Sequence, residues 1–302
     1  MTTARDLRRG VATWAVAAAA LAAAAGCGTT SGAVAAPESE PVFDQGLHDR
    51  LPTDVREAGV ITVATYASYA PASFFAADGR TIVGFEPDLG AALGEVLGVE
   101  LEFVVTDFGD VLDDVQAHRV DAAISAVTDT AEREEQVDFV NYFSAGTSIV
   151  VQRGNPYGIT DLAHLCGEVV AVEVGTVQVD LLERSQSRCQ GEPIEVWTHE
   201  TNDDALVELR TGRAAAVLND YPPAAFLATN ERTSADYQLA SDTQYEPGLY
   251  GIAVAKDRAQ LRDSLQAALE RLLASGDYER VLTEWDVAEG GVDHVSVNGG
   301  GR

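Results

Sequence analysis

The sequence predicts an α/β protein built on mostly parallel sheets and long enough for two domains. The order of its elements indicates the fold class, and its length indicates the number of domains. Short runs of branched and small apolar residues, typical of buried strands, alternate with segments of helical period. The chain has 302 residues, of which 46% are hydrophobic. That length is sufficient for two domains of ordinary size, each with its own core.

The elements follow one another in a regular order. The expected strands are 60–66, 100–105, 121–127, 147–152, 168–174, 194–198, 214–219 and 249–255. The expected helices are 86–97, 110–118, 179–186, 203–211 and 260–285. Pro87 falls in the first turn of its helix, where proline is tolerated. Residues 288–302 are rich in glycine, and we expect them to be disordered.

The composition excludes some functions. Lys and Arg total 20 against 48 Asp and Glu, which gives a net charge of -28. Nucleic acids and anionic lipid surfaces both require a basic face, so neither is an expected partner. The five histidines show no metal-ligand spacing with each other or with the cysteines, and we expect no metal site and no cofactor.

The N-terminus has the features of an export signal. Arg5, Arg8 and Arg9 precede an apolar run, residues 11–25, that is short for a membrane span. The following AAGC resembles a lipoprotein processing site, in which Cys27 is lipidated; simple cleavage that leaves a free thiol is the alternative. We therefore expect a signal peptide over 1–27 and a flexible tether over 28–54.

The two remaining cysteines, Cys166 and Cys189, form an even pair in a chain expected to be exported. A disulfide between them is the simplest interpretation, and closing this loop would add about 3 kcal/mol of stability.

The segment DAAISAVTDTAER, residues 121–133, indicates a site for a small anion. A buried strand leads into a turn in which Thr128 is expected to cap a helix that contains Arg133. Free backbone N–H groups, a hydroxyl and a guanidinium together suit a carboxylate. The alternative is that Arg133 only forms a salt bridge at the helix start.

This segment resembles the signature of the family 3 extracellular solute-binding proteins, the amino-acid receptors of ABC importers. The similarity extends over GVITVATYASYAPASFF, GFEPDLGAALGEVLGVELEFVV, EVVAVEVGTVQVDLLE and GRAAAVLNDYPPAAFL, about residues 55–285. It implies a periplasmic-binding-protein-like type II fold, with two α/β lobes joined by a two-strand hinge. Lobe 1 would comprise 55–146 and a return segment, 247–287, and lobe 2 would comprise 147–246.

The resemblance also implies how a ligand carboxylate is held. Arg133 would bind it from lobe 1, helped by Thr128 and the backbone at Ala126. Thr176 would reach the same carboxylate from lobe 2, although a threonine after a glycine also fits simple turn chemistry.

For the ligand ammonium, the resemblance implies Asp220 as the counter-charge, with Ser125 as a further acceptor. Asp220 precedes Tyr-Pro-Pro, so its alternative role is a helix N-cap. Because Arg133 and Asp220 would lie on different lobes, ligand binding and lobe closure would be one event.

Three aromatic residues and one acid are expected around the ligand side chain: Tyr66, Tyr69, Phe108 and Glu173. An acid at the position of Glu173 would favour a cationic or hydrogen-bond-donating side chain, whereas a solvated glutamate at a strand end is the alternative. A basic or polar neutral amino acid is therefore favoured, and a compact ectoine-like zwitterion stays open. Four other aromatic residues are assigned to core packing: Phe74, Phe75, Phe85 and Phe139.

The implied function is that of the binding component of an ABC importer for an amino acid. Its partners would be the ligand, a permease and an ATPase, and the protein would be a monomer anchored by lipid to the outer face of the cell membrane. The alternative is a cyclohexadienyl (prephenate or arogenate) dehydratase on the same fold. We do not expect an enzyme, because Gln178 occupies the position of the acid that donates the proton in those relatives.

Overall fold

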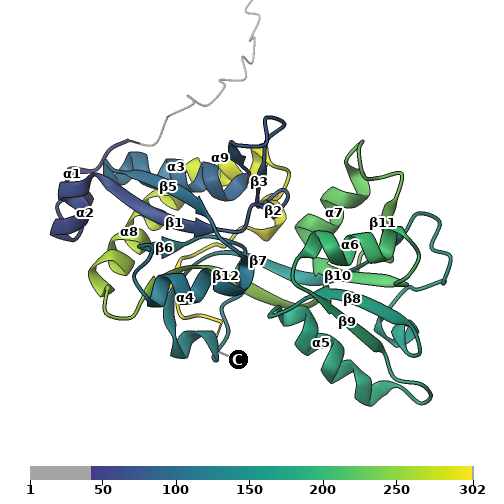
Figure 1. Cartoon of the computed structure of the whole chain (residues 1–302). Helices are drawn as coiled ribbons and strands as arrows, with labels where there is room; N and C mark the ends of the chain where they lie inside the picture. Colours follow the sequence, from purple (N-terminus) through teal and green to yellow (C-terminus); the bar gives the residue numbers. More distant parts are fainter. Residues whose placement is uncertain (1–41, 301–302) are drawn as a thin grey trace, which may run out of the picture. The chain divides into compact units, whose positions relative to one another are not determined.

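The structure is a computed structural model that describes residues 42–300 (Figure 1). The predicted signal peptide, its lipidation site Cys27 and residues 28–41 of the predicted tether lie outside the described residues. Across residues 42–300, the structure contains no helix of the length and apolar character needed to cross a membrane.

A mixed sheet runs through the described chain in the order β5-β1-β6-β12-β7-β10-β8-β9, and β11 and β13 also pair with β7. Its strands are β1 Val60–Thr65, β5 Glu100–Val105, β6 Ala122–Ala123, β7 Val137–Gln152, β8 Val169–Glu173, β9 Glu195–His199, β10 Ala216–Asp220, β11 Tyr237–Leu239, β12 Tyr245–Ala255 and β13 Ser296–Val297. β1 pairs in parallel with β5 and β6, and β8 pairs in parallel with β9 and β10. These two parallel groups are the centres of two α/β lobes.

Helices cover both faces of each parallel group. The α-helices are α1 Gln45–His48, α2 Thr53–Ala58, α3 Phe85–Leu97, α4 Val111–Gln116, α5 Val177–Ser185, α6 Asn202–Arg210, α7 Tyr221–Thr229, α8 Ala259–Ser275 and α9 Asp277–Glu284. The 3-10 helices are η1 Phe108–Asp110, η2 Arg133–Glu135, η3 Leu162–Leu165, η4 Gln186–Arg188 and η5 Ala288–Gly290. In lobe 1, Leu93 of α3 and Leu265 of α8 share a core, and α4 packs in a separate one. In lobe 2, α5 packs in one core and α6 in another.

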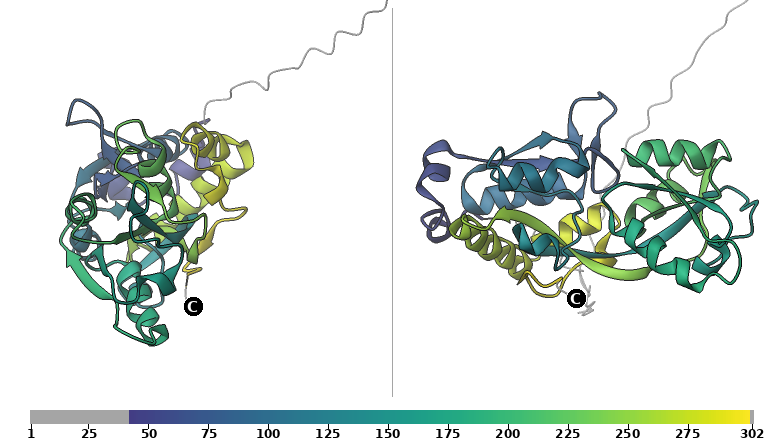
Figure 2. Two further views of the ribbon diagram at one scale, coloured as in Figure 1. Left: turned by 90° about the vertical axis from the view of Figure 1, so that its right-hand side faces the viewer. Right: turned by 60° about the horizontal axis from the view of Figure 1, so that its bottom comes forward.

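Two strands carry the chain between the lobes. The first part of β7 pairs with β12 in lobe 1, up to Ala145 opposite Gly248 and, beyond a register shift, Thr147 opposite Tyr245. The last part of β7 pairs with β10 in lobe 2, beginning with Thr147 opposite Asp220. Figure 2 shows β12, in yellow-green, running between the two groups of elements. The expected arrangement of two α/β lobes joined by two strands is thus confirmed.

A small antiparallel sheet lies on lobe 1 beside this junction. It consists of β2 Ser68–Tyr69, β3 Ser73–Phe75 and β4 Ile82–Val83. Phe85 and Phe139 are fully buried, as predicted. The core assignment is wrong for Phe75, which is 41% exposed, and Phe74 is half-buried against rings of α7 and of the segment after α9.

The expected helix over 260–285 is two helices. Gly276 adopts a left-handed conformation, with φ +85°, and ends α8 before α9 begins. Glycine reaches this conformation without the steric cost that a Cβ would impose, so it acts as a C-cap inside a continuous apolar pattern.

The prediction that 288–302 is disordered is wrong for residues 288–300. β13 pairs with β7, and the side chain of Asn298 accepts a hydrogen bond from the Phe139 N–H. The Gly300 N–H donates to Asp129 Oδ2, and the Gly299 N–H donates to Asn141 Oδ1. Buried polar side chains of lobe 1 therefore fix a segment whose composition alone gives no such signal.

The predicted tether is also wrong where it reaches the described residues, 42–54. Asp44 caps α1 by accepting a hydrogen bond from the Leu47 N–H, and Leu47 and Leu51 are buried in the lobe 1 core.

In lobe 2, Cys166 and Cys189 are joined by a disulfide with a Cα–Cα distance of 5.5 Å, as the sequence predicted.

Candidate functional site

One pocket at the junction of the lobes is lined by every residue that the sequence placed around a ligand. These residues are Tyr66, Tyr69, Phe108, Ser125, Ala126, Thr128, Arg133, Glu173, Thr176 and Asp220. Val177 and Gln178, which were not predicted to bind, line it as well. The strand ends that supply these side chains come from both lobes.

The positively charged part of the pocket centres on Arg133. The expected α-helix is the 3-10 helix η2, and its first N–H is bonded by Thr130 Oγ1 rather than by Thr128. Thr128 instead accepts a hydrogen bond from Arg133 Nη1 through its carbonyl, at 2.7 Å. Arg133 Nη2 donates across the junction to the Gly175 carbonyl, at 2.9 Å. Arg133 is therefore held in place from both lobes, and its side chain forms no salt bridge with the residues that the structure describes.

Thr176 stands at the N-terminus of α5, opposite Arg133. Its hydroxyl donates to the Glu173 carbonyl at 2.8 Å, which is the turn chemistry that the sequence left open. As the N-cap of an α-helix, Thr176 precedes amide N–H groups that have no carbonyl to bond within the helix. These amides and the guanidinium make a positive half-site suited to a carboxylate.

Asp220 supplies the opposite charge at the end of β10. It is 6% exposed, and no side-chain capping bond to α7 is formed, so helix capping is not its role. Tyr69 Oη donates to Oδ2 at 3.2 Å, and Gln178 Nε2 donates to Oδ1 at 2.8 Å. Burial raises the pKa of this carboxyl to about 6. The hydrogen bonds act in the opposite direction, because they stabilise the ionised form, but their effect is smaller.

Glu173 is a second buried carboxyl in lobe 2. It is 7% exposed, so it is not a solvated residue at a strand end, and its Oε1 has no hydrogen-bond partner among the described residues. Burial, and then the charge of Asp203, raise the pKa of Glu173 to about 8. A buried, unpaired carboxyl is costly, and a cationic group beside it would restore its ionised form.

Aromatic rings line the lobe 1 side of the pocket. Tyr66 and Phe108 meet edge to face with ring centroids 6.4 Å apart, and Arg133 lies 6.0 Å from the Phe108 centroid. The backbone N–H of Tyr66 donates to Ser125 Oγ at 2.9 Å, so Ser125 positions this ring. Flat or cationic groups gain favourable contacts against such faces.

Sequence reasoning missed the role of Glu86, which lies in the GFEPD segment. This fully buried carboxyl accepts hydrogen bonds from the Ala126 N–H at 2.6 Å, from Ser73 Oγ at 2.7 Å and from the Tyr142 hydroxyl. The Ala126 N–H is thus already engaged by Glu86, and the help of the Ala126 backbone in holding the carboxylate stays a prediction. Only its carbonyl is left for a ligand, and that carbonyl would suit an ammonium.

The pocket is narrow. Its cavity volume is about 20 Å³, which is room for about one water molecule. A larger cavity of about 390 Å³ adjoins it and shares Phe108, Arg133, Thr176 and Val177. An amino acid can therefore enter only if the polar contacts across the junction open.

Among residues 42–300, no group of three or more His, Cys, Asp or Glu side chains could hold a metal ion.

Comparisons with known proteins place this geometry in a family. The family described as bacterial extracellular solute-binding proteins, family 3, matches residues 61–288. The arginine-binding protein ArgT of Corynebacterium glutamicum is 32% identical over 254 residues, which cover 82% of this chain and 81% of that protein.

Solved structures agree with this assignment. An ancestral arginine-binding protein bound to arginine has a TM-score of 0.68 and 31% identity, over 75% of this chain and 98% of its own; the same scores hold for its glutamine-bound form, over 76% and 98%. An ancestral amino-acid-binding protein, a precursor of cyclohexadienyl dehydratase, has a TM-score of 0.68 and 29% identity, over 77% and 97%. The chain thus belongs to the family 3 bacterial extracellular solute-binding proteins.

Proposed function

We propose that this protein captures an amino acid, with a basic side chain preferred, for an ABC importer. The observation that carries the proposal is the pairing of opposite half-sites around one pocket: Arg133 and the α5 amides on one side, Asp220 on the other. The ligand carboxylate would bind Arg133, and the ammonium would bind Asp220. The Ala126 carbonyl and the Ser125 hydroxyl would accept further bonds from the ammonium.

Glu173 would set the side-chain preference. Its unpartnered Oε1 lies in a pocket bordered by Tyr66 and Phe108, where a guanidinium would gain a charge-assisted hydrogen bond and aromatic contacts. The relatives named for arginine, and the neighbour structure bound to glutamine, support a basic ligand first and a polar neutral one second. Acidic ligands would be disfavoured because their carboxylate would face Glu173.

Closure would accompany binding. We place the hinge where β7 and β12 cross, with lobe 2 spanning 147–246, because at Thr147 the pairing of β7 with β12 ends and its pairing with β10 begins. A ligand that contacts both half-sites binds the closed form better and shifts the population toward it.

The cellular setting follows from the family and from the N-terminal sequence. We propose export, lipidation of Cys27 and attachment to the outer face of the cell membrane, with delivery of the ligand by the monomer to a permease driven by an ATPase. Catalysis by a dehydratase is the weaker alternative. Gln178, which donates to Asp220, is an amide and cannot act as a general acid.

Isothermal titration calorimetry of the purified protein against the standard amino acids and ectoine tests the proposal. We expect micromolar or tighter binding of arginine, weaker binding of glutamine and none of glutamate. A preference for glutamate, or binding of ectoine alone, would contradict it. Conversion of prephenate or arogenate by the protein would instead favour the enzyme.

A further inference from the structure

The small sheet of lobe 1 touches lobe 2 at two points. Tyr69, on β2, accepts a hydrogen bond from the Asp220 N–H at 3.0 Å and donates to its carboxyl. Phe74, on the neighbouring strand β3, lies with its ring centroid 6.0 Å from that of Phe226. Asp220 directly precedes α7, and Phe226 lies within that helix. One continuous segment on each lobe therefore carries both contacts.

The ring of Phe74 is supported from behind by its own lobe. Trp285 meets Phe74 edge to face, with centroids 5.9 Å apart and an interplanar angle of 88°. Trp285 Nε1 donates to Asp88 Oδ2 at 2.6 Å, which ties the indole to α3. Phe74 thus lies between an anchored ring of lobe 1 and a ring of lobe 2.

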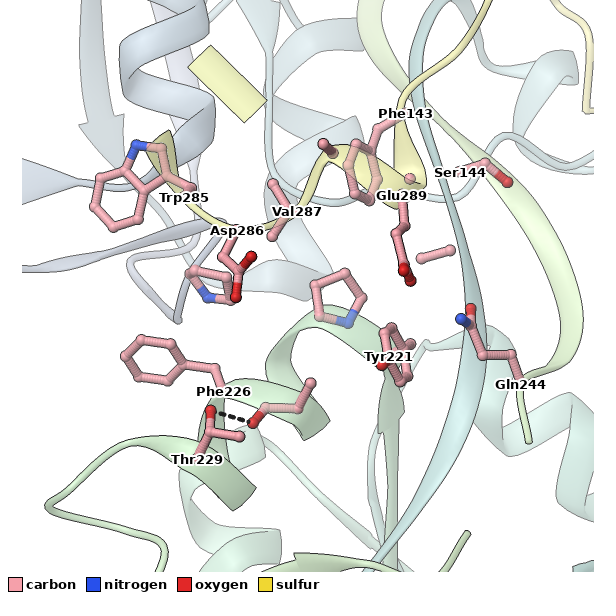
Figure 3. A pocket seen from close by; sticks show the side chains of 16 residues that line it. Phe143, Ser144, Tyr221, Phe226, Thr229, Gln244, Trp285, Asp286, Val287 and Glu289 are labelled. Atoms are coloured by element: carbon pink, nitrogen blue, oxygen red, sulfur yellow. Dashed lines mark hydrogen bonds between the residues drawn. The ribbon is translucent and has the colours of Figure 1, made fainter. Parts of the chain in front are cut away.

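Beside this contact the lobes are separated by open space. A cavity of about 390 Å³ is lined on lobe 2 by Tyr221, Phe226 and Thr229, and on lobe 1 by residues 285–290. Figure 3 shows Trp285 and Phe226 on opposite walls of this cavity. Phe226 and Trp285, the two rings that contact Phe74, both line this cavity, so the contact through Phe74 lies beside it.

We propose that Phe74 is a positioning residue for ligand binding, which stabilises the closed arrangement by packing against Phe226 without touching the ligand. The proposal rests on the proposed function. A ligand ammonium would compete with Tyr69 and Gln178 for Asp220, so the polar contact changes when the ligand binds. The aromatic contact lies outside the ligand pocket and persists. Its effect on affinity is therefore the same factor for every ligand.

The test compares Phe74→Ala with Phe75→Ala, which removes the exposed neighbouring ring on the same strand. An aromatic pair of this kind contributes enough for about a three- to tenfold effect on affinity. Calorimetry should show this loss for arginine and for glutamine alike with Phe74→Ala, an unchanged ratio between them, and no loss with Phe75→Ala. Phe74→Tyr should restore the affinity.

A double-mutant cycle separates the contact from a general loss of packing. Phe226→Ala should weaken binding as Phe74→Ala does, and the double variant should lose no more than either single one. Independent, additive losses, an unchanged affinity, or a loss confined to one ligand would overturn the proposal. Should Phe74→Ala fail to fold, Phe74→Leu takes its place in the cycle.

A readout without any ligand keeps the two proposals apart. Small-angle scattering should show a larger radius of gyration and a longer maximum dimension for Phe74→Ala than for Phe75→Ala. If the wild-type protein binds no amino acid while these differences appear, the proposed function fails and the contact stands. If amino acids bind and the differences are absent, only the role of Phe74 fails.

Discussion

The two half-sites of the pocket differ in how completely their charges are compensated. In lobe 1, Arg133 already donates to two backbone carbonyls, one of them across the junction. In lobe 2, Asp220 receives two side-chain hydrogen bonds, whereas Glu173 Oε1 receives none. Under the proposed function, Arg133 of lobe 1 would bind the carboxylate that all amino acids share, whereas Glu173 of lobe 2, with its unpartnered oxygen, would select among their side chains.

The largest expected effect comes from removing the lobe 1 charge. Arg133→Ala should weaken every amino-acid ligand by about 100-fold or more, because charge-assisted hydrogen bonds to the carboxylate are lost. Titration calorimetry measures this, with Arg184→Ala, an exposed arginine of lobe 2, as control. Retained micromolar affinity would show that the carboxylate binds elsewhere.

In lobe 2, Asp220→Asn keeps the shape and removes the charge. We expect a loss of about 2 kcal/mol, or roughly 30-fold, for all α-amino acids, since each presents an ammonium. Asp236→Asn, an exposed position of the same lobe, is the control. If the variant discriminated between basic and neutral ligands, Asp220 would contact the side chain instead.

Glu173→Gln should separate selectivity from affinity. Arginine should bind about tenfold more weakly, while glutamine should change little, because only the cation pairs with the ionised carboxyl. Exposed Glu183→Gln serves as control. If arginine and glutamine lost affinity equally, Glu173 would have a structural role. The proposed difference between Arg133, which binds every amino acid, and Glu173, which selects among them, would then be contradicted.

The smallest effect concerns pH. The pKa of Glu173, about 8, lies above the usual 4.5, so the folded state holds its proton more tightly than the unfolded state does. Its contribution to stability is therefore present below about pH 4.5 and is lost as the pH rises through about 8. Thermal unfolding of ligand-free protein should show Glu173→Gln becoming more stable relative to wild type between pH 5 and pH 8. A constant difference would indicate a normal pKa.

The same shift predicts proton release on binding. Arginine should bind with loss of a proton near pH 7, since pairing with the guanidinium ionises Glu173. Calorimetry in buffers of different ionisation enthalpy detects this release, and glutamine should show less of it.

Alternating strand and helix patterns predicted the order of the elements well, because local periodicity reflects burial on a sheet or helix face. These patterns failed where a single backbone conformation ends a helix, or where a partner far away in the sequence fixes a segment. Gly276 divides one apolar pattern into two helices, and Gly300 is fixed by Asp129 from far away in the sequence. Gly276 is visible locally but lies within an unbroken apolar pattern, and the partner of Gly300 lies outside any local window.

The residues that line the pocket could be named from the family motif, whereas the hydrogen bonds among them could not. Glu86 takes the Ala126 amide that the motif would give to the ligand, and the Thr176 hydroxyl turns back to its own strand. Such competition between ligand and protein for one donor depends on three-dimensional proximity. The half-buried position of Phe74, between two lobes, is likewise absent from its local sequence.

The C-terminal strand β13 has a practical consequence for anyone who builds a biosensor from this protein. It pairs with the crossing strand β7 at Val140 and Asn141, and Gly300 approaches Asp129 so closely that a Cβ there would lie 2.0 Å from its carbonyl oxygen. A fluorescent protein or affinity tag fused directly after this segment would strain the pairing of β13 with the lobe 1 part of β7. Reporter groups are better attached to remote surface loops of each half, where they can move without restraining the motion that they report.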